Sequence, residues 1–482
     1  MATPHDLSSP PLQAPADAPA STSTFTLWIT LLIILMADGL DLMDATITNI
    51  GAPTVAAELG GGTALVKWLG AGYALALGSF LVVGGRLGDR FGQRRVFLVG
   101  LTGFVAASAL AGLAWSPAAI IVARVLQGSF GALLIPQGMA IMTRTFPKDA
   151  LAKAFGAFGP MLGIFAVGGP ILAGFLIDAN ILGLGWRPMF LLNIVVGGIA
   201  LVLATRWLPV VQGDPAVRID TRGSVLLAAT TFTLLFGLIE GSSEGWGALP
   251  YASIVASAVL FVAFIARQRT SPQPLVAPSL LHNRGFSAGL ATGLLVFASF
   301  NGLMYVVALY FQLGLGFTPS QAALNLLPLT IGIIIASGIW MALPSRPGRA
   351  MVLLGLLTTM AGTTGFLLLI RTTGTGAMWW QVALPVLVIG IGAGACFSSI
   401  FATALGTVAP HEAGAASGSL SAIQQIAAGL GLAVITSAYL GGLPHGQIHA
   451  LTTGLLVVLG IAASCLLAVP LLPRTAAAID DH

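Results

Sequence analysis

Charged residues are scarce in this sequence. Asp, Glu, Lys and Arg make up 7% of its 482 residues, whereas hydrophobic residues make up 56%. Soluble domains usually carry about 25% charged residues, so the composition argues against a soluble catalytic domain. The net charge of +4 does not indicate nucleic-acid binding, because no basic patch is interleaved with exposed aromatic residues. We expect a protein whose environment is largely apolar.

Residues that build cofactor, metal and disulfide sites are also scarce. The two cysteines, Cys396 and Cys465, lie inside apolar segments and indicate no disulfide framework. The six histidines have no metal-binding spacing, and no Gly-x-x-x-x-Gly-Lys-Ser/Thr loop for ATP is present. The sequence therefore predicts neither an enzyme nor a bound metal or cofactor. Residues 1–26 are rich in Pro, Ser and Thr without Lys or Arg, which predicts a disordered tail.

Long apolar runs dominate the rest of the chain. A helix needs roughly 20 apolar residues to cross a bilayer core about 30 Å thick. Using Gly, Pro and charge clusters as boundaries, we expect fourteen such segments between residues 27 and 471. Most of the 20 Lys and Arg residues then fall in loops on one face, and the positive-inside rule makes that face cytoplasmic. The prediction is an all-α multi-pass protein of a bacterial plasma membrane with both termini inside.

The two longest polar connections, 206–222 and 267–285, bracket one extra helix pair. The predicted division is a disordered cytoplasmic tail (1–26), a six-helix half (27–206), two inserted helices with linkers (207–285), a second six-helix half (286–472) and a short cytoplasmic tail (473–482). Two related halves suggest a substrate site between them near the bilayer midplane. A partial repeat supports this division, because Leu87–Arg94 aligns with Leu343–Arg349, although chance recurrence of short Arg-Pro-Gly turns is an alternative. Ser345 stands opposite Asp89 in that alignment.

A dense charged loop separates two of the apolar segments. Its sequence is Gly85-Arg-Leu-Gly-Asp-Arg-Phe-Gly-Gln-Arg-Arg95. Asp89 can accept hydrogen bonds at the N-terminus of another helix, where the helix dipole favours an anion. The arginines can bind carboxylates or lipid phosphates. The alternative is a merely solvated basic turn. The candidate functional residues of the loop are Gly85, Arg86, Asp89, Arg90, Gly92, Arg94 and Arg95.

Three carboxylates lie in the first apolar segment, where an ionisable residue suggests function. Asp38, Asp41 and Asp44 are spaced by three, so they share an arc of roughly 120° on one helix face. Arg124 enters the membrane from the opposite direction and reaches the depth of Asp41 and Asp44. This cluster could take up and release protons, or the arginine could form a permanent buried ion pair. Asp38, near mid-membrane, is the candidate contact for a lipophilic cation.

These motifs resemble those of the major facilitator superfamily, and within it the fourteen-helix drug:proton antiporter branch. The similarity spans roughly residues 27–470. The charged loop carries its most specific element, and Leu42-Met-Asp-Ala-Thr-Ile-Thr-Asn49, Arg124-Val-Leu-Gln-Gly128 and Trp186-Arg-Pro-Met-Phe-Leu-Leu-Asn193 are similar to three further signatures. The fifth-helix antiporter motif is partial. Gly169, Pro170 and Gly174 match it, whereas Phe165 and Ala173 stand where glycines are usual.

The resemblance implies a monomeric major facilitator fold of two six-helix halves plus the inserted pair. It implies a secondary transporter that exports lipophilic or cationic compounds, such as drugs or toxic metabolites, in exchange for protons by alternating access without ATP. The resemblance implies that the charged loop is a cytoplasmic gate and that Gln127 and Gly128 are fourth-helix motif residues. It also makes the first and fourth helices neighbours, so we expect Arg124 to face Asp41 or Asp44. Independently of the resemblance, Gln424 and Gln425 in the Gly- and Ser-rich segment 413–440 are possible cavity-lining residues. A dedicated exporter or a proton-coupled importer of one metabolite is the alternative. A non-transporting sensor or channel would require an appended domain or pore-like repeats, which the sequence does not show.

Overall fold

The structure is a computed structural model. It describes residues 24–147, 150–151, 153–154, 157–210, 212–217, 219–272, 274–275, 278–317, 319–342, 348–405, 408–409 and 412–473. Within these ranges the secondary structure is helical, without a strand. Most of the predicted N-terminal tail, and Ser345 and Arg346 of the partial repeat, lie outside the described residues.

The helices follow one another with short connections. The first group is α1 (Thr24–Leu59), α2 (Gly62–Phe91), α3 (Gln93–Gly112), α4 (Pro117–Thr145), α6 (Phe158–Asp178) and α7 (Pro188–Trp207). Two long helices and a short one come next: α8 (Thr221–Glu244), α9 (Ala248–Thr270) and α10 (Pro278–His282). The last group is α11 (Arg284–Leu309), α12 (Pro319–Leu324), α13 (Leu327–Ala342), α14 (Gly348–Thr373), α15 (Trp379–Leu405), α16 (Ala413–Gly442) and α17 (Gln447–Ala468). Single turns are η1 (Ile181–Gly183), η2 (Tyr310–Gly314), η3 (Gly374–Gly376), η5 (Leu443–His445) and η6 (Val469–Leu471).

Twelve helices of the described ranges are long and apolar enough to cross a membrane. Two further predicted spans coincide with α6 and with α13, whose apolar part, Leu327–Ile339, is shorter. The prediction of an all-α, multi-pass architecture is therefore confirmed. The count of fourteen spans and the cytoplasmic location of the termini stay predictions.

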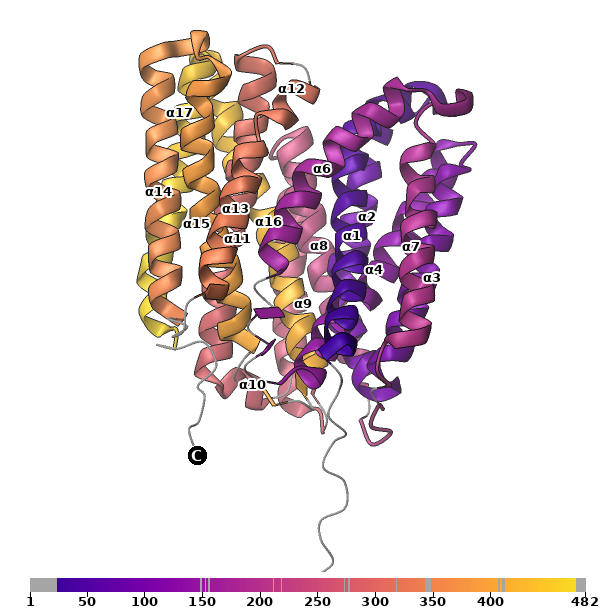
Figure 1. Cartoon of the computed structure of the whole chain (residues 1–482). Helices are drawn as coiled ribbons and strands as arrows, with labels where there is room; N and C mark the ends of the chain where they lie inside the picture. The colour runs from indigo at the N-terminus through magenta and orange to yellow at the C-terminus, as the bar shows by residue number, and fades with distance from the viewer. Residues whose placement is uncertain are drawn as a thin grey trace, which may run out of the picture.

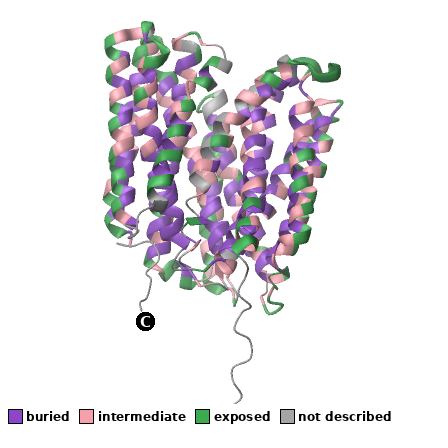
Figure 2. Cartoon of the chain, viewed as in Figure 1, coloured by how far each residue is buried: buried purple, intermediate pink, exposed green. Residues whose placement is uncertain are grey.

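The long helices form two groups that stand side by side (Figure 1). In the first, α4 packs against α2 and α3, and α1 packs against α6 and α7. In the second, α15 packs against α13 and α14, and α16 packs against α11 and α17. Contacts between α2 and α16, and between α6 and α13, join the groups. Buried residues concentrate on the inward faces of both (Figure 2). Figure 1 shows α1 beginning and α17 ending at the same end of the bundle, which we call the basic end because the charged loop lies there.

Glycines allow α2 and α4 to approach closely. A Cβ on Gly128 would lie 2.3 Å from the Tyr73 carbonyl oxygen, and one on Gly84 would lie 2.1 Å from the Ala132 carbonyl oxygen. Larger residues at either position would push the two backbones apart. Small residues at helix contacts are the usual solution in membranes, where apolar surface alone does not drive association. The short separation lets polar groups of the two helices reach one another.

Helix α8 contacts both groups. Leu235 fills the surface left open by Gly78 of α2 and by Gly429 of α16. Near the other end of α8, the Trp246 indole nitrogen donates to the Ser437 hydroxyl of α16 at 2.8 Å. Helix α9 packs mainly on α8 and is the least buried of the twelve span helices, at 17%. The inserted pair thus has one helix against the core and one facing outward.

Candidate functional site

The three aspartates of α1 point into the first helix group. Asp38 and Asp41 keep 8% and 7% of their surface exposed, and Asp44 keeps 1%. Arg124 of α4 is completely buried. Transferring an unpaired charge from water into such an environment is strongly unfavourable, so the partners of each group determine what it can do.

Asp44 is fully engaged by donors. The Arg124 Nη1 donates to Asp44 Oδ2, while the Asn193 Nδ2 of α7 donates to Asp44 Oδ1 at 2.7 Å. The Gln127 Nε2 donates to the same Oδ1 at 3.1 Å. Of the two aspartates that the depth argument left open, the structure places Asp44 against Arg124.

A second layer holds these donors in place. The Gln127 Nε2 also donates to the Ser108 hydroxyl of α3 at 2.8 Å, and Gln127 Oε1 accepts from Arg124 Nη1 at 2.8 Å. The Arg124 Nε donates to the Leu69 carbonyl of α2 at 2.9 Å, and the guanidinium carbon lies 4.4 Å from the centre of the Tyr73 ring. One network therefore joins α1, α2, α3, α4 and α7. Donation from both Nε and Nη1, together with stacking on the Tyr73 ring, suits a planar guanidinium better than the single ammonium group of lysine.

Asp41 and Asp38 have fewer partners. Asp41 Oδ1 accepts a hydrogen bond from the Tyr73 hydroxyl, and it packs on Gly131, where a Cβ would lie 2.7 Å from that oxygen. Asp41 is also close enough to Asp44 and Arg124 to experience both charges. In the described part of the chain, Asp38 Oδ1 is buried without a hydrogen-bond partner. Asp38 is therefore the carboxylate with capacity for a further ligand.

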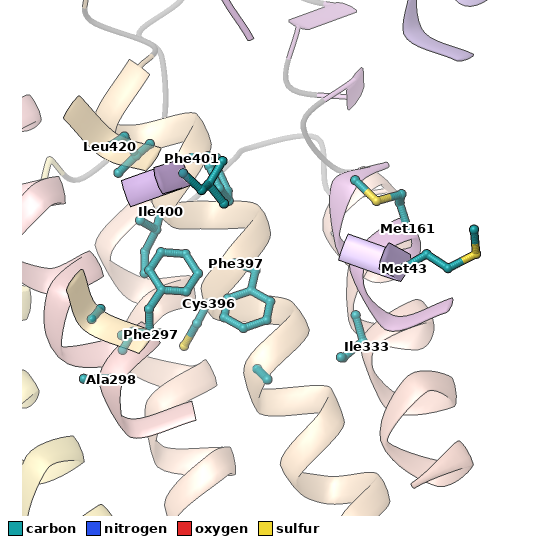
Figure 3. Close-up of a cluster of buried hydrophobic side chains, with 14 of the residues drawn as sticks. Met43, Met161, Phe297, Ala298, Ile333, Cys396, Phe397, Ile400, Phe401 and Leu420 are labelled. Carbon is teal, nitrogen blue, oxygen red and sulfur yellow. The ribbon is translucent and has the colours of Figure 1, made fainter. Parts of the chain in front are cut away.

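A cluster of buried apolar side chains includes aromatic rings of the second helix group (Figure 3). Phe297 of α11 stacks on Phe397 of α15 with ring centres 5.2 Å apart, and Phe300 meets Phe397 edge-on at 4.8 Å. Figure 3 shows Met43 of α1 and Met161 of α6 across from these rings. The carboxylates and the aromatic rings thus come from different helix groups.

The partial fifth-helix motif lies on α6 against α1. A Cβ on Gly169 would lie 2.2 Å from the Thr46 hydroxyl, so this glycine permits the contact. Phe165, which replaces a motif glycine, fills the surface of Gly39, where a Cβ would lie 2.3 Å from its ring. The absence of a side chain at Gly39 of α1 therefore leaves room for the large Phe165 side chain of α6. Pro170 and Gly174 lie in the same helix.

The two glutamines of α16 are half-buried. The Cβ of Gln425 lies 3.6 Å from where a side chain on Gly78 would begin, so Gln425 lies at the contact between α16 and α2. This location is consistent with lining the boundary between the helix groups. Gln424 is adjacent in the same helix.

The charged loop is a one-residue turn between α2 and α3. Gly92 has φ 93° and ψ 128°, which L residues with side chains rarely adopt. The Asp89 carboxylate accepts from Gln93 Nε2 and from Arg144 Nη2 of α4, both at 3.2 Å, and lies 4.0 Å from Arg86 Nη1. Asp89 is 2% exposed. The loop is therefore folded onto α4 and is not a merely solvated turn.

Other residues of the loop bind the linkers of the inserted pair. Arg86 donates to the Leu275 carbonyl, and to the Pro274 carbonyl at 2.8 Å. Asp214 N donates to the Asp89 carbonyl at 2.9 Å. A cavity of about 240 Å³ remains between these segments and the start of α16, lined by Arg86, Asp89, Arg144, Gln212, Gly213, Asp214, Val217 and Glu412.

The remaining residues of the charged loop make fewer contacts with other segments. Arg94 donates to the Thr205 carbonyl at the end of α7, the Arg90 guanidinium lies 5.2 Å from the Phe91 ring centre, and Arg95 is exposed. Gly85 is buried within α2. In the partial repeat, Gly348 begins α14 and its carbonyl accepts from the Ser399 hydroxyl at 2.9 Å.

Comparison with known proteins identifies the family. The model of the Major Facilitator Superfamily matches residues 31–432, which include the carboxylate network, the charged loop and the second helix group from α11 into α16. The chain belongs to the major facilitator superfamily. Members of this superfamily are transporters and not enzymes, in agreement with the prediction from composition.

Relatives within the superfamily are named for drug export. The chain is 39% identical over 422 residues to the "Probable actinorhodin transporter" of Streptomyces coelicolor, covering 86% of this chain and 72% of that protein. It is 33% identical over 457 residues to the "Puromycin resistance protein pur8" of Streptomyces alboniger, covering 91% and 89%. These relatives place this superfamily member in the drug-efflux branch.

A solved structure supports the fold. The proton:xylose symporter XylE, bound to 6-bromo-6-deoxy-D-glucose, matches with a TM-score of 0.65 at 12% identity, covering 93% of this chain and 95% of the symporter. At this identity the likeness concerns the major facilitator fold alone.

Proposed function

We propose that this chain exports lipophilic or cationic compounds in exchange for protons by alternating access. The observation that carries the proposal is the set of three buried carboxylates on one face of α1, of which Asp44 is paired with the buried Arg124. Ionisable residues are expensive to place in a membrane and are retained where they serve a function. Proton exchange requires groups that change protonation between two states of the protein, and these carboxylates supply them.

Each of the three carboxylates has a different role in this proposal. The Asp44–Arg124 pair, with its neutral donors, holds α1 and α4 together and sets the charge near Asp41. Asp41, bonded to the Tyr73 hydroxyl, is placed to exchange a proton. Asp38, whose Oδ1 lacks a partner among the described residues, is the counter-charge for a cationic substrate. The proton affinity of each carboxylate depends on its solvation and on neighbouring charges, and alternating access would change both.

The aromatic rings of α11 and α15 suit the apolar part of a substrate. Stacked and edge-on rings bind flat apolar surfaces well, and Phe300 remains partly exposed. The names of the relatives, an actinorhodin transporter and a puromycin resistance protein, support export of such compounds. Because the first of these names one product, export of a single metabolite is the second candidate function.

The proposed arrangement in the cell follows the sequence predictions. Fourteen helices cross the plasma membrane as two six-helix halves and an inserted pair, and the basic end faces the cytoplasm. The charged loop acts as a gate there, because Asp89, Arg86 and Arg144 tie α2 to α4 and to the linkers. The chain works as a monomer without ATP.

The test uses the purified full chain in liposomes loaded with a fluorescent lipophilic cation. We expect export that requires an imposed proton gradient. Asp41→Asn should abolish the gradient dependence, and Asp38→Asn should reduce cation export at least tenfold. Glu58→Gln is the matched control, because it changes a carboxylate of the same helix that is exposed and paired with Arg187. Gradient-independent export by the unchanged chain, or full activity of both aspartate variants, would refute the proposal.

A further inference from the structure

The inserted helix pair carries a cavity that the transport site does not use. It has a volume of about 410 Å³ and is lined by Ile219, Asp220, Thr221, Arg222, Arg267, Ser271 and Pro272. These residues lie where α8 begins at Thr221 and α9 ends at Thr270. Both helices are long and apolar enough to span a membrane. The cavity therefore lies at the level where two spans leave the hydrocarbon and meet lipid headgroups.

One arginine of the cavity is held rigidly. The Arg267 Nε donates to Asp220 Oδ2 and its Nη2 to Asp220 Oδ1, both at 3.0 Å. Although burial alone would raise the pKa of Asp220, hydrogen bonds from Arg267, from the Gly223 amide and from Ser271 lower that pKa overall. Asp220 therefore stays ionised and keeps Arg267 in place. Within the described ranges, Arg267 Nη1 makes no hydrogen bond, so a positioned donor remains open.

The second arginine of the cavity is Arg222. Arg222 is exposed, and among the described residues it forms neither a hydrogen bond nor an ion pair. Asp220 compensates the charge of Arg267, so Arg222 gives the cavity a net positive charge. Two guanidinium groups, one held by Asp220 and one exposed, form a suitable site for the oxygens of a phosphate.

Helix α9 also exposes an apolar surface. Val255, Val259 and Val262 expose 62%, 64% and 69% of their surface, and Phe261 exposes 49%. These side chains belong to a span helix that faces outward from the bundle, so in a membrane acyl chains cover them. A phosphate in the cavity and acyl chains on α9 would belong to one molecule.

We propose that this cavity binds the phosphate group of an anionic phospholipid, with Arg222 supplying the charge and Arg267 Nη1 a fixed donor. The acyl chains lie along the exposed face of α9. Basic pockets between membrane helices near the membrane surface are suited to such headgroups. A zwitterionic lipid binds less well, because its ammonium group adds positive charge beside Arg222.

The experiment is native mass spectrometry of the full chain in detergent, titrated with phosphatidylglycerol or with phosphatidylcholine. We expect phosphatidylglycerol to bind more tightly than phosphatidylcholine. Arg222→Gln should weaken phosphatidylglycerol binding about fivefold, corresponding to about 1 kcal/mol for one basic residue at the membrane surface. Arg206→Gln is the matched control, because Arg206 is also exposed at the basic end but lies beside Trp207, outside the cavity.

The outcomes separate the possible ligands. Equal phosphatidylglycerol binding by Arg222→Gln and the unchanged chain would overturn the proposal, as would equal binding of the two lipids. Inorganic phosphate forms a third arm. If phosphate at equal concentration displaces phosphatidylglycerol, the cavity is a site for soluble anions, and the assignment to a lipid fails. None of these measurements depends on transport, so the result stands apart from the proposed export function.

Discussion

Removing the positive partner of Asp44 should destabilise the protein severely. Arg124→Met deletes the charged donor to Asp44 and the bonds to Gln127 and to the Leu69 carbonyl. Asp44 then remains buried as an anion with two neutral amide donors. Breaking a buried ion pair by removing one partner costs about 3–5 kcal/mol, and we expect a loss in that range in the free energy of unfolding. Asp44→Asn alone should also destabilise, because it leaves a buried guanidinium without its anion.

The double variant Arg124→Met/Asp44→Asn distinguishes this account from a general packing defect. It removes both charges, and the amide oxygen that replaces the carboxylate can still accept from Gln127 and Asn193. Neutral replacements of buried pairs are often close to harmless. We therefore expect the double variant to lose no more than about 2 kcal/mol, less than Arg124→Met alone. The two substitutions would then show a favourable coupling, as expected for groups in direct contact.

The assay is reversible unfolding in mixed micelles, followed by intrinsic fluorescence for the unchanged chain, both single variants and the double variant. Glu58→Gln serves as a reference for loss of an exposed ion pair, which is expected to change stability by less than about 1 kcal/mol. Strictly additive losses would refute the buried-pair account. So would an Arg124→Met variant as stable as the reference.

Two further predictions concern backbone geometry. Gly92→Ala should destabilise the protein by about 1–3 kcal/mol, because Gly92 has a positive φ between α2 and α3. A thermal shift assay measures this loss. The control is Gly365→Ala, which lies in open space within α14 and should not destabilise the protein. Gly39→Ala should destabilise the protein by about 1–3 kcal/mol, because the added methyl group overpacks against Phe165. Adding Phe165→Leu to this variant should restore most of the lost stability. If Gly39→Ala is equally stable with Phe or Leu at position 165, the close fit between the two residues is contradicted.

Local sequence patterns were enough to predict an all-α, multi-pass membrane protein. Apolar length requires membrane helices, and the three-residue spacing places the aspartates of α1 on one face. Counting depth along antiparallel helices predicted Arg124 at the level of Asp41 and Asp44, without choosing between them. These inferences depend on helix geometry alone, which the sequence specifies residue by residue. The six-two-six division and the roles of the site residues stay predictions.

The partners in the network could not be predicted in the same way. The spacing of Tyr73, Ser108 and Asn193 in the sequence does not show which of them faces Asp44 or Asp41 across a helix contact. That depends on the rotation of each helix about its axis, which packing of glycines such as Gly128 against neighbouring backbones determines. One signal was present, because Asn193 closes the segment that begins at Trp186 and resembles a family signature. Its contact with Asp44 became evident only in the folded chain.

The contacts of α8 determine what would happen if α8 and α9 were removed from this protein. Leu235 packs into the surface of Gly78 on α2 and that of Gly429 on α16, and Arg86 holds the linker that follows α9. Deleting the inserted pair would therefore uncover two apolar grooves and leave an arginine without its acceptors. A derivative without α8 and α9 would need bulkier residues at positions 78 and 429 and a neutral residue at 86 before the two helix groups could pack together without exposed grooves. Helix α8 and the linker after α9 are thus structurally integrated, and the residues that contact them should change together with them.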